Sequence, residues 1–147
     1  MNAIQAKGVF HRDIKADNFL FTDQKKNQIK LIDFGLAAQF KHDMKEQKFS
    51  EILGTQQYVA PEVIDQCYDQ RSDYWSAGIM LYVMLCGDFP YDFDTNKSVK
   101  NNYKSFKAKI KEKLIYPSHI KISNQAKSMI ERLLTINPEK RLTIQDA

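Results

Sequence analysis

HRDIKADN, residues 11–18, is the stretch from which the organisation of this 147-residue chain is best read. It places Asn18 five residues after Asp13. Two short apolar segments follow, Phe19–Thr22 and Ile29–Ile32, and a polar turn separates them. Short apolar runs joined by such a turn are typical of a β-hairpin. The sequence therefore predicts a loop rich in polar side chains that leads directly into a hairpin.

A second acid, Asp33, comes at the end of the predicted hairpin, and Phe34 and Gly35 follow it. An acid beside a flexible glycine, close to Asn18 at the mouth of a hairpin, is a plausible cation site. Mg²⁺ prefers oxygen ligands and uses few carboxylates, which leaves room for phosphates and water. Lys15 would add a positive charge for a phosphate group. The residues alone thus indicate a magnesium–phosphate site, with ordinary turn residues as the plain alternative.

Four later segments are predicted to form helices. Ser72–Cys86 is apolar or nearly so on every face, which predicts a buried central helix that ends at Gly87. The lysine-rich segment Lys100–Lys113 has sparse apolar residues and predicts a surface helix. Ser123 can cap a third helix with apolar residues at positions i, i+3, i+4, i+7 and i+8, and Thr143 can cap a fourth.

The composition fits one globular domain. Hydrophobic residues make up 43% and charged residues 27% of the chain, close to the average for folded proteins. We expect no membrane partner, because no apolar run is long enough to cross a bilayer. We expect no nucleic-acid partner, because the net charge is only +4 and lysines alternate with acids. Cys67 and Cys86 form no metal or redox motif, which predicts two buried thiols and a reducing, cytoplasmic location.

Five further motifs accompany HRDIKADN in order along the chain. They are DFG at 33–35, GTQQYVAPE at 54–62, DYWSAG at 73–78, GDFP at 87–90 and NPEKR at 137–141. Together they resemble the large lobe of eukaryotic protein kinases of the serine/threonine class. They are most similar to the calcium/calmodulin-dependent and calcium-dependent protein kinases. The non-periodic stretch between Gly35 and Pro61 would then be the activation segment.

The resemblance implies a mainly α-helical fold with a small β-hairpin, part of a two-lobed α+β kinase domain. Residues 1–147 would form a partial kinase domain with the catalytic loop, the activation segment, and the central and C-terminal helices. The five glycines form no G-x-G-x-x-G motif, and no VAIK-type lysine precedes the catalytic loop. We therefore expect the small lobe to be missing from this chain and the domain to be truncated at both ends.

The resemblance also assigns roles to single residues. Asp13 would be the catalytic base, and Lys15 would neutralise the transferred phosphoryl group. Asn18 and Asp33 would bind Mg²⁺. Together with Lys15 and Leu20 they would bind ATP, with Leu20 lying under the adenine.

Other residues would control the activation segment. Arg12 would be the arginine that responds to the state of this segment. The presence of Lys15 together with Thr55 resembles the pattern of the serine/threonine class. Glu51 stands where many relatives carry a phosphorylated threonine. We hypothesise that its carboxylate pairs with Arg12 as a built-in substitute for phosphate. Phosphorylation of Ser50 is the rival hypothesis, and a solvated loop acid is the plain alternative.

Three residues would be structural. Asp73 would anchor the backbone of the catalytic loop. Glu62 and Arg141 would form a buried ion pair. The plain alternatives are solvated turn residues and a packed helix.

The implied function is transfer of phosphate from ATP, with Mg²⁺, to Ser or Thr hydroxyls of a protein substrate. We expect the chain alone to be inactive, because half of the phosphate clamp is absent. One alternative is a non-catalytic binding module or decoy; another is a generic phosphate-binding domain outside this family. The presence of Asp13, Asn18 and Asp33 together favours the kinase, because a binding module gains nothing from keeping all three.

Overall fold

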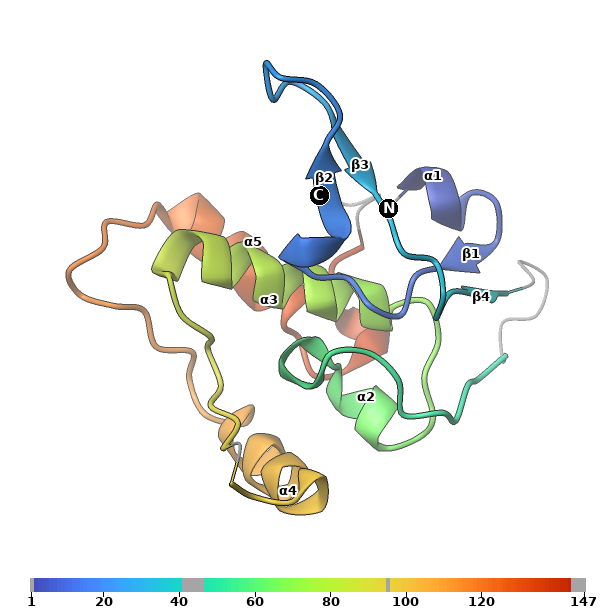
Figure 1. Cartoon of the computed structure of the whole chain (residues 1–147). Coiled ribbons are helices and arrows are strands. Elements are labelled where there is room, and N and C mark those ends of the chain that lie inside the picture. The colour runs from blue at the N-terminus through green and yellow to red at the C-terminus, as the bar shows by residue number, and fades with distance from the viewer. Residues whose placement is uncertain (1, 41–46, 95, 144–147) are drawn as a thin grey trace.

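The computed structural model describes residues 2–40, 47–94 and 96–143. Its longest helix, α3, crosses the middle of the molecule, and α5 lies along it (Figure 1). The helices are α1 (Asn2–Gln5), α2 (Pro61–Ile64), α3 (Ser72–Cys86), α4 (Val99–Lys109) and α5 (Asn124–Leu133), and three 3₁₀ turns are η1 (Ala16–Asn18), η2 (Gln56–Tyr58) and η3 (Pro138–Lys140). The predicted mainly α-helical fold with a small β component is confirmed.

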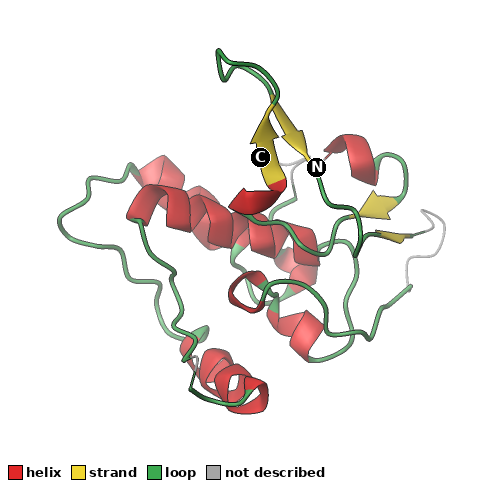
Figure 2. Cartoon of the chain, viewed as in Figure 1, coloured by secondary structure: helices red, strands yellow, loops and turns green. Residues whose placement is uncertain are grey.

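Two small antiparallel sheets lie beside these helices (Figure 2). Strands β2 (Phe19–Phe21) and β3 (Ile29–Leu31) form the predicted hairpin, with Leu20 opposite Lys30. The second sheet, which the sequence analysis did not predict, pairs β1 (Val9–Phe10) with β4 (Ala38–Gln39). It joins the start of the catalytic-loop region to the segment after Asp33.

Helix α3 has the predicted bounds and ends at Gly87, whose left-handed backbone (φ 79°) closes the last turn. A side chain at Gly78 would place its Cβ 2.8 Å from the Cβ of Leu133, so glycine here lets α5 approach closely. The prediction that α3 is buried on every face is wrong for its last turn. Met84 is 61% exposed and Leu85 is 36% exposed, because the described elements pack against the other faces of that turn.

The other predicted helices are present with shifted ends. Helix α4 begins after Ser98, whose hydroxyl accepts a hydrogen bond from the backbone N–H of Asn101, and its last residue is Lys109. Helix α5 begins after Ser123, whose hydroxyl accepts from the N–H of Ala126, as predicted. The helix predicted after Thr143 lies outside the described residues.

The core is aromatic where α3 and α4 meet. Trp75 of α3 stacks against Tyr91 and meets the ring edge of Phe106 from α4. Cys86, at the C-terminal end of α3, is buried as predicted, but Cys67 is exposed because it lies in the loop after α2, so the prediction of two buried thiols is wrong for Cys67.

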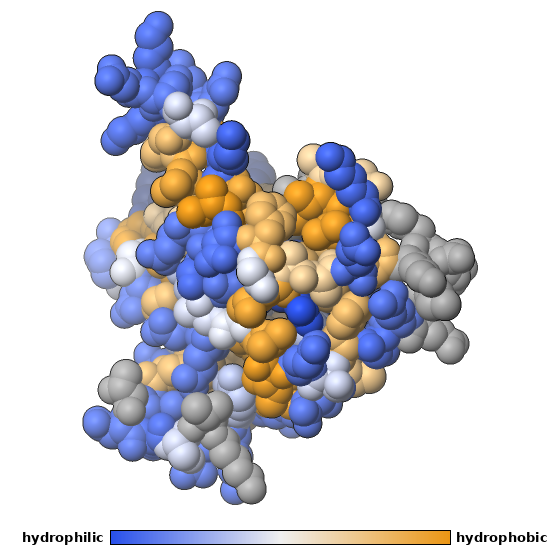
Figure 3. Space-filling model, turned by 45° about the vertical axis from the view of Figure 1, so that its right-hand side comes forward, coloured by the Kyte–Doolittle hydropathy of each residue, from blue (hydrophilic) through white to orange (hydrophobic). Residues whose placement is uncertain are grey.

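The polarity of the molecular surface changes along the hairpin. The tip of the hairpin is hydrophilic, and hydrophobic side chains lie below it (Figure 3).

Within the described ranges, no helix is long and apolar enough to cross a membrane.

Candidate active site

Asp13 lies at the centre of a hydrogen-bonded cluster. Its Oδ1 accepts from the backbone N–H of Thr55 (2.8 Å) and from the Thr55 hydroxyl (2.7 Å). Its Oδ2 is 2.9 Å from Nζ of Lys15 and also accepts from Nδ2 of Asn18 at 3.3 Å. Burial raises the pKa of the Asp13 carboxyl, but the hydrogen bonds from Lys15 and Thr55 outweigh it and hold the pKa below its usual value. Asp13 is therefore an ionised carboxylate that two parts of the chain hold in place.

Lys15 supplies the positive charge of this cluster. Its Nζ also donates to the Thr55 hydroxyl at 2.8 Å. The hydrogen bond to Asp13 raises the pKa of Lys15, and the charges of Asp13, Asp17 and Asp33 act in the same direction. A lysine that faces three acids remains charged and can neutralise a bound phosphate.

Asp73 fixes the backbone that carries Asp13. This side chain of α3 is almost fully buried, and its carboxylate accepts from the backbone N–H groups of His11 (2.7 Å) and Arg12 (2.9 Å). Arg12 has a left-handed backbone (φ 67°), a conformation that costs energy outside glycine. Gly54 packs so close that a Cβ there would lie 2.6 Å from the Arg12 carbonyl oxygen. The anchor role predicted for Asp73 agrees with these contacts.

Asp33 has a different environment. It is exposed, has a left-handed backbone (φ 59°), and, within the described part of the chain, accepts a single long hydrogen bond (3.3 Å), from the N–H of Gly35. The N–H of Ile32 donates to the carbonyl of Asn18 at 2.9 Å, so the end of β3 is joined to the catalytic loop.

A carboxylate and an amide oxygen suit Mg²⁺, which keeps most of its other sites for water and phosphate. The Nδ2 of Asn18 donates to the carbonyl of Asp13 at 2.7 Å, which leaves the amide oxygen of Asn18 free for a cation. Among the described residues, no group of three or more His, Cys, Asp or Glu side chains is arranged to hold a metal. Asn18 and Asp33 supply the two ligand types that suit Mg²⁺, an amide oxygen and a carboxylate.

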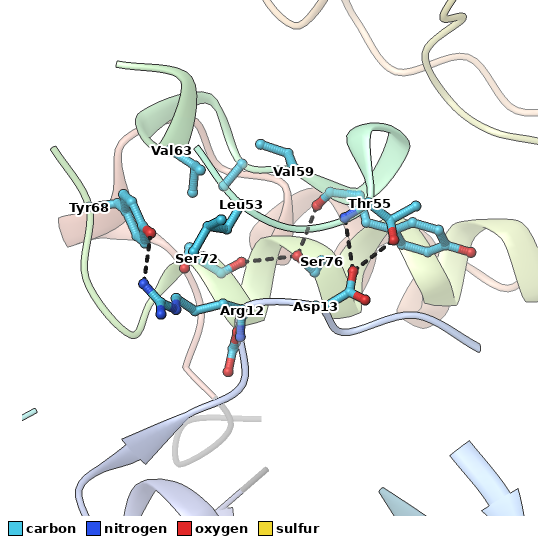
Figure 4. A pocket seen from close by; sticks show the side chains of 12 residues that line it. Arg12, Asp13, Leu53, Thr55, Val59, Val63, Tyr68, Ser72 and Ser76 are labelled. Atoms are coloured by element: carbon cyan, nitrogen blue, oxygen red, sulfur yellow. Dashed lines mark hydrogen bonds between the residues drawn. The ribbon is translucent and has the colours of Figure 1, made fainter. Parts of the chain in front are cut away.

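Leu20 lies on β2 and is half exposed. It is accessible to a flat ligand, but no described residue covers it from the other side. The cavity behind Asp13, drawn in Figure 4, has a volume of only about 10 Å³. Because that volume holds about one water molecule, a nucleotide or peptide must approach Asp13 from solvent.

Arg12 and Asp13 point in opposite directions from neighbouring positions, Arg12 toward Tyr68 and Asp13 toward Thr55 (Figure 4). The predicted contact between Arg12 and Glu51 is present, with Nη1 and Oε2 2.8 Å apart. Ser50 is exposed, and its carbonyl accepts a hydrogen bond from the side chain of Gln66.

The predicted pair of Glu62 and Arg141 is also present. The Arg141 guanidinium forms two hydrogen bonds with the carboxylate, at 2.5 and 2.9 Å. Both side chains are buried, and the guanidinium lies over the ring of Trp75. The pair joins α2 to the segment after η3.

Two residues near this site, Tyr68 and Asp69, were not predicted from the sequence. The Tyr68 hydroxyl donates to the Glu51 carbonyl at 2.8 Å. The Asp69 carboxylate pairs with Lys48 at 2.7 Å and with Arg71 at 2.5 Å. Both lie in the loop between α2 and α3, where no motif or periodicity singles them out.

Comparison with known proteins gives matches along the whole chain. The protein kinase domain model matches residues 1–147. Calcium-dependent protein kinase 3 of Plasmodium yoelii yoelii is 40% identical, over 100% of this chain and 26% of the relative. Calcium-dependent protein kinase 14 of Arabidopsis thaliana is 40% identical over 94% and 25%, and calcium-dependent protein kinase 3 of Oryza sativa subsp. japonica is 41% identical over 92% and 24%. The chain thus spans about a quarter of the length of these relatives.

Proposed function

This chain belongs to the protein kinase family, and we propose that it serves as the large lobe of a serine/threonine kinase. The reaction is transfer of the terminal phosphoryl group of ATP to a Ser or Thr hydroxyl of a protein substrate. The observation that carries the proposal is the cluster of Asp13, Lys15 and Thr55, which joins the catalytic loop to the activation segment 42 residues later.

In this mechanism Asp13 orients the substrate hydroxyl and accepts its proton, since it is ionised and its position is fixed. Lys15 offsets the negative charge that develops on the transferred phosphoryl group. Asn18 and Asp33 would hold Mg²⁺, which neutralises charge on the phosphates. Leu20 offers an apolar surface to the adenine.

Two finer proposals accompany this one. Glu51 replaces an activating phosphate by its contact with Arg12, so Arg12 has a negatively charged partner without phosphorylation at Ser50. The free thiols of Cys67 and Cys86 suit a reducing compartment, which supports a cytoplasmic location.

The test compares the 147-residue chain with the same chain joined to a kinase small lobe. We expect no measurable phosphoryl transfer from the chain alone, since these residues contain no Gly-rich loop and no strand lysine. With the small lobe, transfer to a generic Ser/Thr peptide should appear, and Asp13→Asn should lower it by about 10²–10⁴-fold. Asp17→Asn, an exposed acid of the same loop, is the matched control and should leave the rate nearly unchanged.

Two outcomes would contradict the proposal. The first is absence of transfer from a folded two-lobed protein that binds ATP and Mg²⁺. This would favour the alternative, a non-catalytic binding module or decoy. The second is unchanged transfer in Asp13→Asn, which would remove Asp13 from the reaction.

A further inference from the structure

Residues 47–55 of the activation segment form no helix or regular strand, yet they are held against the loop that precedes α3. Phe49 and Tyr68 form an isolated antiparallel bridge, with N–H to O distances of 2.8 and 3.2 Å. The Gln66 side chain donates to the carbonyl of Ser50 at 3.0 Å. These contacts fix the backbone of the segment on one side of Glu51.

Tyr68 is the most deeply buried member of this contact. It is 1% exposed, and its ring packs against Phe10 and Phe49, with centroids 6.4 and 6.0 Å away. Its hydroxyl donates to the Glu51 carbonyl at 2.8 Å and accepts from Nη1 of Arg12 at 3.5 Å. Burial raises the pKa of Tyr68, so the hydroxyl keeps its proton and remains a donor at neutral pH.

The position of the Arg12 side chain depends on the same residues. Its guanidinium lies over the touching rings of Phe10 and Phe49, 5.9 and 5.7 Å from their centroids. Its Nε donates to the carbonyl of Leu36, and its Nη1 reaches the carboxylate of Glu51. That carboxylate is mostly exposed, and an exposed ion pair contributes little by itself to ordering a segment.

We propose that Tyr68 is a positioning residue that fixes the Glu51 backbone and thereby holds Arg12 against the two phenylalanine rings. The ion pair of Arg12 and Glu51 forms because Tyr68 has already set the distance between its two partners. Since Asp13 follows Arg12 directly, this arrangement also fixes the candidate catalytic base. The effect of Tyr68 on catalysis rests on the proposed kinase function. Its effect on the positions of Glu51 and Arg12 does not.

The first experiment is hydrogen–deuterium exchange on the full 147-residue chain and its Tyr68→Phe variant. Phenylalanine keeps the ring and removes only the hydroxyl. Exchange in residues 47–53 should rise about fivefold, the change in open population expected from one lost hydrogen bond of ordinary strength. Tyr82→Phe is the matched control, because the Tyr82 hydroxyl donates to the carbonyl of Ile115 in another part of the chain. That variant should leave residues 47–53 unchanged.

A comparison with Glu51→Gln separates the two sources of order. This variant keeps the backbone carbonyl that Tyr68 binds and removes the charge that Arg12 binds. The proposal requires a smaller rise in exchange for Glu51→Gln than for Tyr68→Phe. The reverse order would show that the ion pair alone orders the segment and would overturn the proposal. A rise throughout the chain in Tyr68→Phe, rather than in residues 47–53, would also overturn it.

A spectroscopic measurement detects the effect on Arg12 directly. In the ¹⁵N NMR spectrum, the Nε–Hε signal of Arg12 should lie apart from those of solvent-exposed arginines and move toward them in Tyr68→Phe. A signal that stays in place would contradict the positioning role. In the two-lobed enzyme, Tyr68→Phe should lower kcat and leave the KM for ATP unchanged. If that enzyme transfers no phosphate at all, the exchange and NMR results still decide the role of Tyr68.

Discussion

Asp13 and Asp33, the two carboxylates of the candidate site, have opposite environments. Asp13 is nine-tenths buried and is held by Lys15, Asn18 and Thr55. Asp33 is exposed, and among the described residues its carboxylate accepts a hydrogen bond from the N–H of Gly35 alone. The region around Asp13 is therefore complete within this chain, whereas the region around Asp33 is open.

The surroundings of the two acids explain this difference. The backbone beside Asp13 is anchored by Asp73, which α3 carries into the core. Asp33 follows a hairpin with exposed large apolar side chains, at Leu20, Phe21 and Ile29, and precedes another, at Phe34. A group of exposed apolar side chains marks a surface that contacts a ligand or another part of a protein. We infer that the base is fixed by the large lobe itself, and that the cation side is completed by what binds against the hairpin.

The largest expected effect concerns the buried ion pair that supports the Asp13 region. Arg141→Ala should lower the free energy of unfolding by about 3–5 kcal/mol, because it leaves the Glu62 carboxylate buried without its partner. That is a large share of the roughly 5–15 kcal/mol that stabilises a domain of this kind. Urea unfolding followed by tryptophan fluorescence measures it, since Trp75 lies under the guanidinium.

The control for Arg141→Ala is an exposed pair. Lys107 and Asp65 also form a salt bridge, and Lys107→Ala should cost at most about 1 kcal/mol. In a double-mutant cycle, removing Glu62 and Arg141 together should cost clearly less than the sum of the two single losses. Additive losses would show that the two residues are not coupled.

An intermediate effect is expected at Asp69, which joins Lys48 of the activation segment to Arg71 at the start of α3. Burial raises the pKa of Asp69, but the hydrogen bonds from Arg71 and Lys48 outweigh it and lower the pKa from 3.8 to about 2. A carboxyl with a lowered pKa in the folded state stabilises the protein above its unfolded pKa. This stabilisation is lost as the pH falls toward 2.

Wild type should therefore lose about 2 kcal/mol more stability than Asp69→Asn between pH 5 and pH 2. Thermal or urea unfolding across this range measures the difference. Asp92→Asn removes an exposed pair with Lys109 and should follow the wild type closely. Parallel pH curves for wild type and Asp69→Asn would show that the Asp69 pair is not part of the fixed region.

These residues also show what could be predicted from the sequence. The bounds of α3, the hairpin and the Ser123 cap follow from local patterns, which act over a few residues. The contact of Arg12 with Glu51 came from the motif resemblance, because no local pattern joins residues 39 positions apart.

The parts that were missed depend on tertiary contacts. Strands β1 and β4 have two residues each, too few to show alternation. Tyr68 and Asp69 lie in an irregular loop, and their roles arise only when that loop meets the activation segment. The exposure of Met84 and Leu85 depends on which faces of α3 are covered, which an apolar sequence alone does not specify.

The smallest expected effect on stability is at Asp33. Asp33→Asn should change the free energy of unfolding by less than about 0.5 kcal/mol, because the side chain is exposed and its hydrogen bond from Gly35 is long. Asparagine also tolerates the left-handed backbone of this position, whereas Asp33→Ala adds a conformational cost of about 1 kcal/mol.

The two Asp33 variants thus separate the charge of the residue from its backbone conformation, with urea unfolding as the measurement. In the two-lobed enzyme both should lose phosphoryl transfer, since each lacks the carboxylate proposed to bind Mg²⁺. If Asp33→Asn instead destabilised the chain by more than about 1–2 kcal/mol, Asp33 would be part of the packed region. The contrast with Asp13 would then fail, because the hairpin side of the site would also be fixed by this chain alone.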